Sequence, residues 1–213
     1  METSIVTQGL EYRAGASFAI QDVSLHVPAG ALYGFLGPNG SGKTTTIRLL
    51  LGLLRPRAGT IRLLGQPVPQ ALPGILARTG VVPDQPHLHR HLSVGQSIEF
   101  HAAFYPIWDA AWAESLRQEF DLRPSQTLGG LSKGEMAKLL ILLALCQTPD
   151  LLVLDEPTEG LDPVVRREVL TALLDYVSRR GATVFMSSHL INDIERFCDW
   201  VGVMDRDSSL SCR

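Results

Sequence analysis

A glycine-rich run lies between an apolar segment and a leucine-rich segment. The apolar segment, residues 31–36, has the length of a strand, and residues 45–54 have the length and composition of a helix. Between them, residues 37–44 read Gly-Pro-Asn-Gly-Ser-Gly-Lys-Thr. This spacing fits the phosphate-binding loop that connects a strand to a helix. Because strand, loop and helix then follow one another directly, the run favours an α/β fold with a parallel sheet.

Each residue type in this run has a chemical reason to be there. Glycines let backbone N–H groups converge on phosphate oxygens, and the N-terminus of the following helix adds its dipole. We expect Lys43 to reach the β- and γ-phosphates of a nucleotide and Thr44 to ligate Mg²⁺. The alternative is a glycine-rich turn without a ligand, and the flanking strand and helix disfavour it. The residues expected to bind nucleotide are Gly37, Pro38, Asn39, Gly40, Ser41, Gly42, Lys43, Thr44 and Thr45.

Apolar runs of strand length and helical runs alternate at both ends of the chain, which predicts a mostly parallel α/β core. The strands expected from these runs are residues 60–64, 79–82, 151–154, 183–187 and 200–204. Helices are expected at residues 164–180 and 191–198. Several prolines and glycines at residues 65–74 predict irregular chain between strands.

The middle of the chain has a different pattern. Three segments carry helical spacing with no strand between them, at residues 93–105, 108–120 and 133–147. We therefore expect a single domain, 1–213, with an inserted helical subdomain. Its parts are a nucleotide-binding core at 1–84 and 150–205, a helical subdomain at about 85–149 and an atypical tail at 206–213.

Two acidic residues follow a strand that is apolar throughout. Asp155 and Glu156 come directly after residues 151–154, and ligands of open α/β sheets bind at the carboxyl ends of the strands. We expect Asp155 to hold Mg²⁺ through water and Glu156 to polarise the attacking water. An apolar strand ending in two acids is by itself equally typical of an exposed loop. Together with a phosphate loop, the pair indicates nucleotide hydrolysis.

Five segments, in their order along the chain, resemble the ATP-binding cassette of ABC transporters. They are the phosphate loop, Leu-Ser-Lys-Gly-Glu at 131–135, Asp-Glu-Pro-Thr at 155–158, Glu-Gly-Leu-Asp at 159–162 and Ser-Ser-His at 187–189. The resemblance extends from about Leu10 to Asp205. It implies a P-loop NTPase core with a mostly parallel sheet, N-terminal antiparallel strands and an inserted helical subdomain. It also implies a head-to-tail dimer that holds two ATP molecules, with Mg²⁺, between its subunits.

The resemblance assigns roles to further residues. Ser132 and Gly134 of one subunit would touch the γ-phosphate bound by the other, and His189 would contact the γ-phosphate and the attacking water. Together with Glu156 and Lys43, His189 therefore completes the expected catalytic set. Tyr12 matches the aromatic residue on which adenine stacks, although packing within a strand is the alternative. Asp162 belongs to an intact Gly-Leu-Asp segment and is counted among the nucleotide-binding residues.

The sequence departs from the usual cassette pattern at several positions. The Leu-Ser-Gly-Gly-Gln signature has Lys133 in place of its first Gly and Glu135 in place of its Gln. Leu-Ser-Lys-Gly and Ser-Ser-His resemble bacterial exporters of the ABC-2 class, which include antibiotic and lantibiotic resistance systems. Where most cassettes carry a Gln that senses Mg²⁺, Asp84 is in register and Gln85 is one residue late. We expect Asp84 to ligate Mg²⁺ through water. Glu159 stands where a Ser is common.

Charge and apolar length limit the partners. The formal net charge is −3, which does not favour non-specific binding of nucleic acid. The longest apolar run, residues 139–146, is far shorter than the roughly 20 residues needed to cross a bilayer. We expect a cytoplasmic ATPase subunit, peripheral on the inner face of the cell membrane, that powers separate transmembrane permease subunits. It would form a dimer with itself or with a second cassette subunit, and no nucleic acid partner is expected.

Two alternative functions belong to other classes. One is a soluble ABC-type mechanoenzyme acting on nucleic acid or ribosomes. A single cassette, no heptad stretch and a negative net charge disfavour it. The other is a regulatory cassette that binds ATP without hydrolysing it, which the presence of Glu156 and His189 disfavours.

Three features outside the motifs have more than one interpretation. His87, His89 and His91 alternate as strand-borne metal ligands would, but a polar loop facing a membrane partner is favoured. Trp108 and Trp112, one helical turn apart, suit either core packing or a partner groove. Relatives usually place a glycine turn, a strand and a helix after the segment that matches 200–206. Because residues 207–213 differ, we expect a truncated or altered C-terminus that leaves the strand at 200–204 unpaired on one side.

Overall fold

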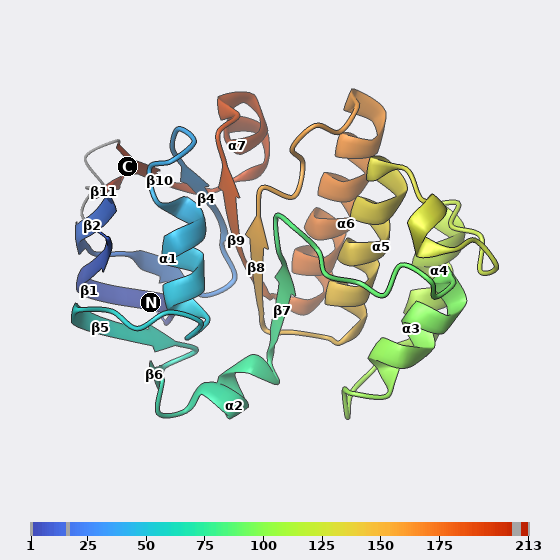
Figure 1. Cartoon of the computed structure of the whole chain (residues 1–213), viewed down its shortest axis with the longest axis horizontal. Helices are drawn as coiled ribbons and strands as arrows, with labels where there is room; N and C mark the ends of the chain where they lie inside the picture. The colour runs from blue at the N-terminus through green and yellow to red at the C-terminus, as the bar shows by residue number, and fades with distance from the viewer. Residues whose placement is uncertain (1, 16–17, 206–209, 213) are drawn as a thin grey trace.

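The computed structural model describes residues 2–15, 18–205 and 210–212, and their strands form two sheets (Figure 1). The larger sheet contains β4 Leu32–Leu36, β7 Thr79–Val82, β8 Leu151–Asp155, β9 Thr183–Ser188, β10 Trp200–Met204 and β11 Leu210–Cys212. Its strand order is β11-β10-β4-β9-β8-β7, and every neighbouring pair except β10 and β11 is parallel. The predicted parallel core is therefore confirmed.

The second sheet is antiparallel and includes the N-terminal part of the chain. Its strands are β1 Thr3–Ala14, β2 Phe18–Val23, β3 His26–Pro28, β5 Ala58–Leu63 and β6 Gln66–Val68. The order is β2-β1-β5-β6, and β3 also pairs with β1. The expectation of N-terminal antiparallel strands is confirmed.

Several helices begin at side-chain caps that the sequence supplies. The helices are α1 Lys43–Leu50, α2 Leu72–Leu76, α3 Val94–Ala102, α4 Ala110–Glu119, α5 Lys133–Cys146, α6 Pro163–Arg180 and α7 Ile191–Phe197. A short 3-10 turn, Leu128–Gly130, precedes α5. Ser93 and Ser132 form capping boxes at α3 and α5, and Asp109 and Asp162 accept backbone N–H groups at α4 and α6. These bonds satisfy N–H groups that a helix start leaves without partners.

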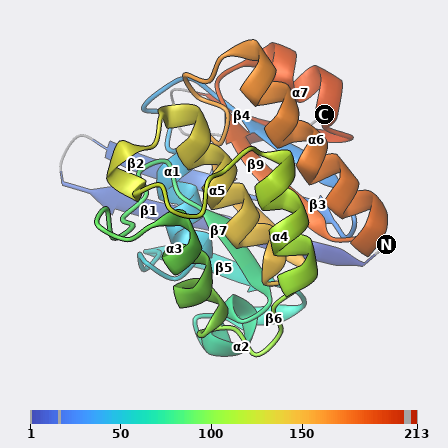
Figure 2. The same cartoon turned by 90° about the vertical axis from the view of Figure 1, so that its right-hand side faces the viewer.

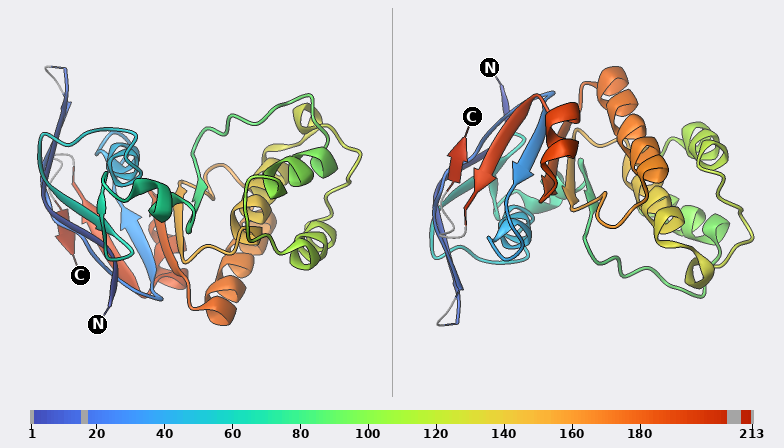
Figure 3. Two further views of the ribbon diagram at one scale, coloured as in Figure 1. Left: turned by 90° about the horizontal axis from the view of Figure 1, so that it is seen from below. Right: turned by 90° about the horizontal axis from the view of Figure 1, so that it is seen from above.

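The sheets and helices form layers. Figure 3 shows the antiparallel sheet on one side, the parallel sheet in the middle and α3, α4, α5 and α6 on the other side. Figure 2 looks onto the helical side, where α3, α4 and α5 lie in front of the sheets. One buried apolar cluster joins the antiparallel sheet to α1 and the near face of the parallel sheet, and another joins the opposite face to α4, α5 and α6.

Strand β8 explains why both faces of the parallel sheet need apolar residues. Its side chains alternate between the two clusters, with Leu151 and Val153 in the cluster around α1, and Leu152 and Leu154 in the cluster around α5 and α6. Successive residues of a strand point to opposite faces, so a strand covered on both sides must be apolar throughout. The polar sequence begins only at Asp155, where the strand ends. This places the two acids at the carboxyl edge of the sheet.

All three helical segments expected in the middle of the chain are present as α3, α4 and α5. They share one buried cluster with the parallel sheet and α6. The limits assigned to the helical subdomain, about 85–149, remain a prediction. Within the described ranges, none of the helices combines the length and apolar character that a membrane crossing requires.

The structure corrects two expectations. The segment at 65–74, expected to be irregular, contains β6 and the start of α2, because β6 pairs with β5 and Ile75 of α2 is buried in the core. Strand β10 was expected to have an unpaired edge, but β11 pairs with it antiparallel, Met204 opposite Leu210. Of the tail expected to be atypical, residues 206–209 and 213 lie outside the described residues.

Tyr176 connects α6 to both α4 and the turn before β8. Its ring stacks on that of Trp112 with centroids 5.4 Å apart, and its buried hydroxyl donates a 2.7 Å hydrogen bond to the carbonyl of Pro149. Trp112 is half-buried and therefore packs against the core, as one of its two expected interpretations requires.

We expect Tyr176→Phe to lower the free energy of unfolding by about 1 kcal/mol, because the ring stack remains while a buried carbonyl loses its donor. Thermal denaturation would record a melting temperature lower by roughly 2–4 °C. Tyr105→Phe is the control, since the Tyr105 hydroxyl has no hydrogen bond to the described residues. Equal effects of the two substitutions would contradict the role of the Tyr176 hydroxyl.

Candidate active site

The phosphate loop connects β4 to α1 as predicted, and two of its glycines are required by geometry. Gly42, just before α1, has φ 112°, which residues with a Cβ rarely adopt. A Cβ on Gly37 would lie 2.5 Å from the carbonyl oxygen of Met204. The N–H of Gly37 also donates to the carbonyl of Ser188 at the end of β9. The loop is therefore hydrogen-bonded to the end of β9 and passes close to the end of β10, the two strands that flank β4.

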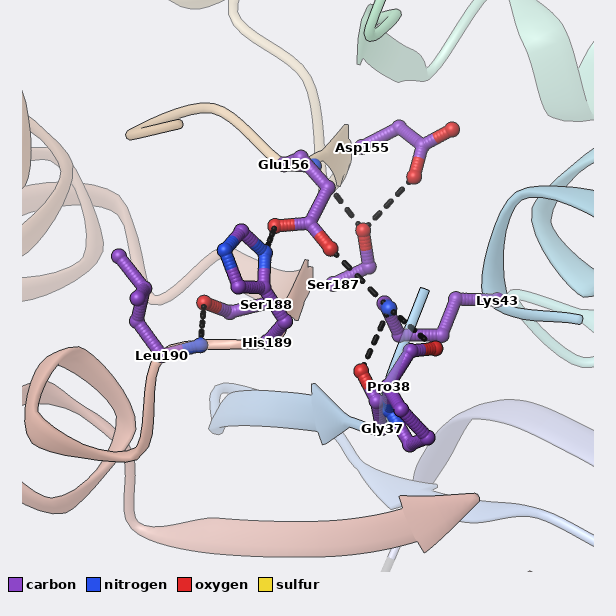
Figure 4. A network of polar contacts seen from close by, with 9 residues as sticks. All are labelled: Gly37, Pro38, Lys43, Asp155, Glu156, Ser187, Ser188, His189 and Leu190. Atoms are coloured by element: carbon purple, nitrogen blue, oxygen red, sulfur yellow. Dashed lines mark hydrogen bonds and ion pairs between the residues drawn. The ribbon is translucent and has the colours of Figure 1, made fainter. Parts of the chain in front are cut away.

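Lys43, the one cationic residue of this loop, is buried, with 5% of its surface exposed. Its ammonium group donates to the carbonyls of Gly37 at 2.6 Å and Pro38 at 3.2 Å. It also forms an ion pair with Glu156, with Nζ 3.1 Å from Oε1 (Figure 4). A buried ammonium requires such partners. Since Glu156 follows β8, this contact connects the loop after β4 to the end of another strand.

Asp155 and Ser187 lie opposite each other where β8 and β9 end. The hydroxyl of Ser187 donates a 2.7 Å hydrogen bond to Asp155 Oδ1, and the Thr44 side chain is also hydrogen-bonded to Asp155. Burial raises the pKa of the Asp155 carboxyl, which is 4% exposed, and these two hydrogen bonds oppose that rise. The negative charges of Asp84 and Glu156 raise the pKa further. A nearby cation would relieve this burial of negative charge.

Glu156 is held at both carboxylate oxygens. Oε1 faces Lys43, and Oε2 lies 2.9 Å from Nδ1 of His189 (Figure 4). The Glu156 side chain is 9% exposed and that of His189 is 30% exposed, so the carboxylate is the more deeply buried of the two. The three side chains expected to be catalytic are thus brought into one chain of contacts.

A cavity of about 280 Å³ opens over these residues. It is lined by Asn39, Gly40, Gly42, Lys43, Thr44, Thr45, Asp84, Glu156 and Glu159. Asp84 is therefore at the site, whereas Gln85 is not among the residues lining the cavity. This lining combines backbone N–H groups, an ammonium, hydroxyls and carboxylates, a set that suits a phosphate chain with a divalent cation.

The side chains present fit Mg²⁺ with a nucleotide. Thr44 and Asp84 line the cavity, and Asp155 is hydrogen-bonded to Thr44, which gathers hydroxyl and carboxylate oxygens of the kind that Mg²⁺ prefers. Mg²⁺ in such sites is completed by water and by substrate phosphates. Across the described residues, no cluster of three His, Cys, Asp or Glu side chains suits a metal ion on its own.

Other expected nucleotide contacts lie outside this cavity. Ser132 caps α5 and Asp162 caps α6. Gly134, in the first turn of α5, packs against Val165 of α6. Tyr12 pairs with Ile20 across β1 and β2, half-buried against the core of the antiparallel sheet. Gly37, Pro38 and Ser41 of the phosphate loop are also not among the residues that line the cavity. The roles of all the expected site residues, these included, remain predictions.

Of the three alternating histidines, His87, His89 and His91, two make contacts with other rings. The rings of His89 and His91 lie 5.7 Å apart, and His89 also meets the exposed ring of Phe100 edge-on. His87 faces other cavities than that of the phosphate loop.

Two residues of the site were not singled out by the sequence. In the sequence, Ser187 is one residue of the Ser-Ser-His segment that resembles ABC cassettes, and Glu159 stands where these cassettes commonly have a Ser. Ser187 contacts both acids, and Glu159 lines the cavity. The alignment of β9 with β8 would identify Ser187, since it faces Asp155, but that alignment is a property of the fold.

Comparison with known proteins agrees with this geometry. Residues 20–159 match the family described as ABC transporter. The Nod factor export ATP-binding protein I of Cupriavidus metallidurans is 37% identical over 196 residues, covering 90% of this chain and 64% of that protein. The bacitracin transport ATP-binding protein BcrA of Bacillus licheniformis is 34% identical over 206 residues, covering 96% of this chain and 67% of that protein. The chain thus spans about two thirds of these relatives.

Solved structures show the same architecture. An ATP-binding subunit of an ABC transporter superposes with a TM-score of 0.88 at 28% identity, covering 99% of this chain and 90% of that chain. A nucleotide-free ATP-binding cassette from an ABC transporter shares the fold with a TM-score of 0.81 at 21% identity, covering 98% of this chain and 90% of that one. Sequence and fold agree, and the chain belongs to the ABC transporter family.

Proposed function

We propose that this chain binds ATP with Mg²⁺, hydrolyses it, and thereby powers an ABC exporter through separate transmembrane subunits. The observation that carries the proposal is the carboxylate of Glu156, held between Lys43 and His189 at the wall of the phosphate-loop cavity. Family membership supports the same conclusion. A nucleoside triphosphate is the ligand class that phosphate loops followed by an acidic strand end accommodate, and the relatives' names specify ATP.

In this proposal the chain's own residues supply positioning and charge. Backbone N–H groups of the loop and Lys43 hold the β- and γ-phosphates and stabilise charge that develops on the γ-phosphoryl group. Thr44, Asp155 and Asp84 would hold Mg²⁺, which would neutralise phosphate charge. Glu156 orients the attacking water and accepts its proton, and His189 fixes the carboxylate in that orientation.

The oligomeric state and the remaining site residues belong to the same proposal. Ser132 and Gly134, at the start of α5, would contact the γ-phosphate bound by a second cassette, and Asp162 would lie at the same interface. Tyr12 would stack on adenine. The core at 1–84 and 150–205 would bind nucleotide, and the helical segment at about 85–149 would contact the membrane partner.

The relatives support an exporter rather than another use of ATP. Their names assign them to Nod factor export and bacitracin transport. We therefore place this chain at the cytoplasmic face of the membrane, as a peripheral subunit in a dimer with itself or a second cassette. Co-purification with a polytopic membrane protein tests this assignment, and ATPase activity stimulated by nucleic acid would contradict it.

Glu156→Gln tests the hydrolytic carboxylate. We expect turnover to fall about 10²- to 10⁴-fold, because the amide accepts no proton, while ATP still binds. Steady-state phosphate release and a fluorescent-nucleotide titration measure the two quantities. Glu119→Gln makes the same change on the exposed end of α4 and serves as the control. Turnover equal to that of the wild type would contradict the role of Glu156.

Lys43→Met tests the phosphate loop. The substitution keeps an apolar stem and removes the ammonium, so we expect ATP affinity to fall at least about tenfold. Lys138→Met is the matched control, since Lys138 is also paired with a glutamate, Glu168, but lies on α5 away from the cavity. Retention of wild-type affinity in Lys43→Met would argue against this role.

Asp155→Asn should change the stability of the fold and the binding of a metal ion in opposite directions. Because burial raises the pKa of Asp155, ionisation favours the unfolded state, so this carboxyl costs stability above its ordinary pKa of about 4. Without nucleotide, we expect the variant to melt at a higher temperature than the wild type at pH 7, with the difference shrinking toward pH 4.

Thermal denaturation over this pH range, and Mn²⁺ binding as a probe of the metal site, measure the two effects. The variant should bind Mn²⁺ with nucleotide more weakly. Asp175→Asn is the control, because Asp175 is a half-exposed partner of Arg179 and its loss should lower stability slightly at neutral pH. A lower melting temperature for Asp155→Asn at pH 7 would contradict the expected sign.

A further inference from the structure

Ser187 lies near the end of β9 and contacts both Asp155, the last residue of β8, and Glu156, which follows it. It is fully buried, and its hydroxyl makes two hydrogen bonds (Figure 4). It donates to Asp155 Oδ1 at 2.7 Å and accepts from the backbone N–H of Glu156 at 2.9 Å. A serine hydroxyl can donate only one hydrogen bond. Here it donates that bond to the Asp155 carboxylate, and a lone pair of its oxygen accepts the bond from the Glu156 N–H.

The bond to Glu156 falls where the backbone leaves the sheet. The aligned pairs of β8 and β9 end at Asp155 and Ser187. Glu156 then has φ 51°, a left-handed conformation that residues with a Cβ rarely adopt. Its N–H pairs with the Ser187 side chain rather than with a strand carbonyl. A buried N–H without a partner is unfavourable, so this hydroxyl stabilises the turn at Glu156.

The turn at Glu156 determines where its carboxylate lies. That carboxylate faces Lys43 at 3.1 Å and His189 at 2.9 Å, and these two residues come from other segments of the chain. A change of the backbone dihedrals at Glu156 would move both oxygens relative to these partners. The same hydroxyl also fixes one oxygen of Asp155, so one side chain sets the relative orientation of the two acids.

We propose that Ser187 is a positioning residue for ATP hydrolysis, which holds the left-handed turn at Glu156 and orients the Asp155 carboxylate. This inference rests on the proposed function, since it gives Ser187 a role in the reaction assigned to Glu156. A merely structural role would make Ser187 equivalent to other buried hydroxyls of the same strand.

Thr183, at the opposite end of β9, is such a hydroxyl. It is buried, lies 2.6 Å from Ser4 Oγ and accepts from the N–H of Gly30 at 2.9 Å. Neither partner lines the phosphate-loop cavity. Thr183→Val therefore removes a strand hydroxyl with as many partners as that of Ser187, but far from the acids.

The test compares Ser187→Ala, Ser187→Thr and Thr183→Val. For Ser187→Ala we expect kcat for ATP hydrolysis to fall about 10- to 100-fold, because the attacking water is misaligned, with the Kd for ATP in EDTA changed less than about threefold. Ser187→Thr keeps the hydroxyl, and its kcat should stay within about fivefold of the wild type. Thr183→Val should lower the melting temperature and leave kcat within about threefold.

A second measurement does not need activity. Without nucleotide, hydrogen exchange of the Glu156 amide should become about tenfold faster in Ser187→Ala and remain unchanged in Thr183→Val. Unchanged exchange at Glu156, a Ser187→Ala kcat equal to that of Thr183→Val, or a Ser187→Thr kcat as low as that of Ser187→Ala would overturn the inference. A wild-type chain without ATPase activity would instead overturn the proposed function, and the exchange result would still report whether Ser187 holds the turn.

Discussion

The site depends on the parallel alignment of β4, β9 and β8. In this register Phe35 pairs with Ser187, and Ser187 with Asp155, so the carboxyl ends of the three strands finish together. The phosphate loop follows the end of β4, His189 follows β9 and Glu156 follows β8. A shift of one residue between β8 and β9 would turn Asp155 to the opposite face and exchange its side chain with an apolar one. The backbone ladder of the sheet is therefore what sets the distances within the site.

Most of the fold and much of the site could be predicted from sequence because their signals are local. The phosphate loop is a continuous run whose glycines satisfy local geometry, as Gly42 shows with its positive φ. Apolar strands and helix caps can also be predicted from patterns of only a few consecutive residues. Asp155 and Glu156 could be placed because an apolar strand leads directly to them. The family resemblance added His189, whose distance from Glu156 along the chain hides their contact.

What could not be predicted depends on contacts between distant segments. Ser187 is separated from Asp155 by 32 positions along the chain. Only the register between β8 and β9 brings the two side chains within hydrogen-bond distance. The pairing of β11 with β10 was not expected, because a short polar segment has no strand signal apart from the edge on which it lies. Likewise, β6 and α2 form in a proline-rich stretch because β5 offers an edge and the core accepts Ile75. In each case tertiary contact overrides a weak or contrary local preference.

The contact between Lys43 and Glu156 has a further consequence for the proposed reaction. The same ammonium that would hold the phosphates is paired with the carboxylate that would activate water. A bound phosphate chain offers Lys43 a second and more highly charged partner, so the two anions compete for one cation. Glu156 would then lose one of its two restraints and keep the other, Nδ1 of His189 at 2.9 Å. The turn at Glu156, held by Ser187, does not depend on Lys43. The carboxylate would therefore lose its contact with Lys43 without losing the backbone conformation that directs it.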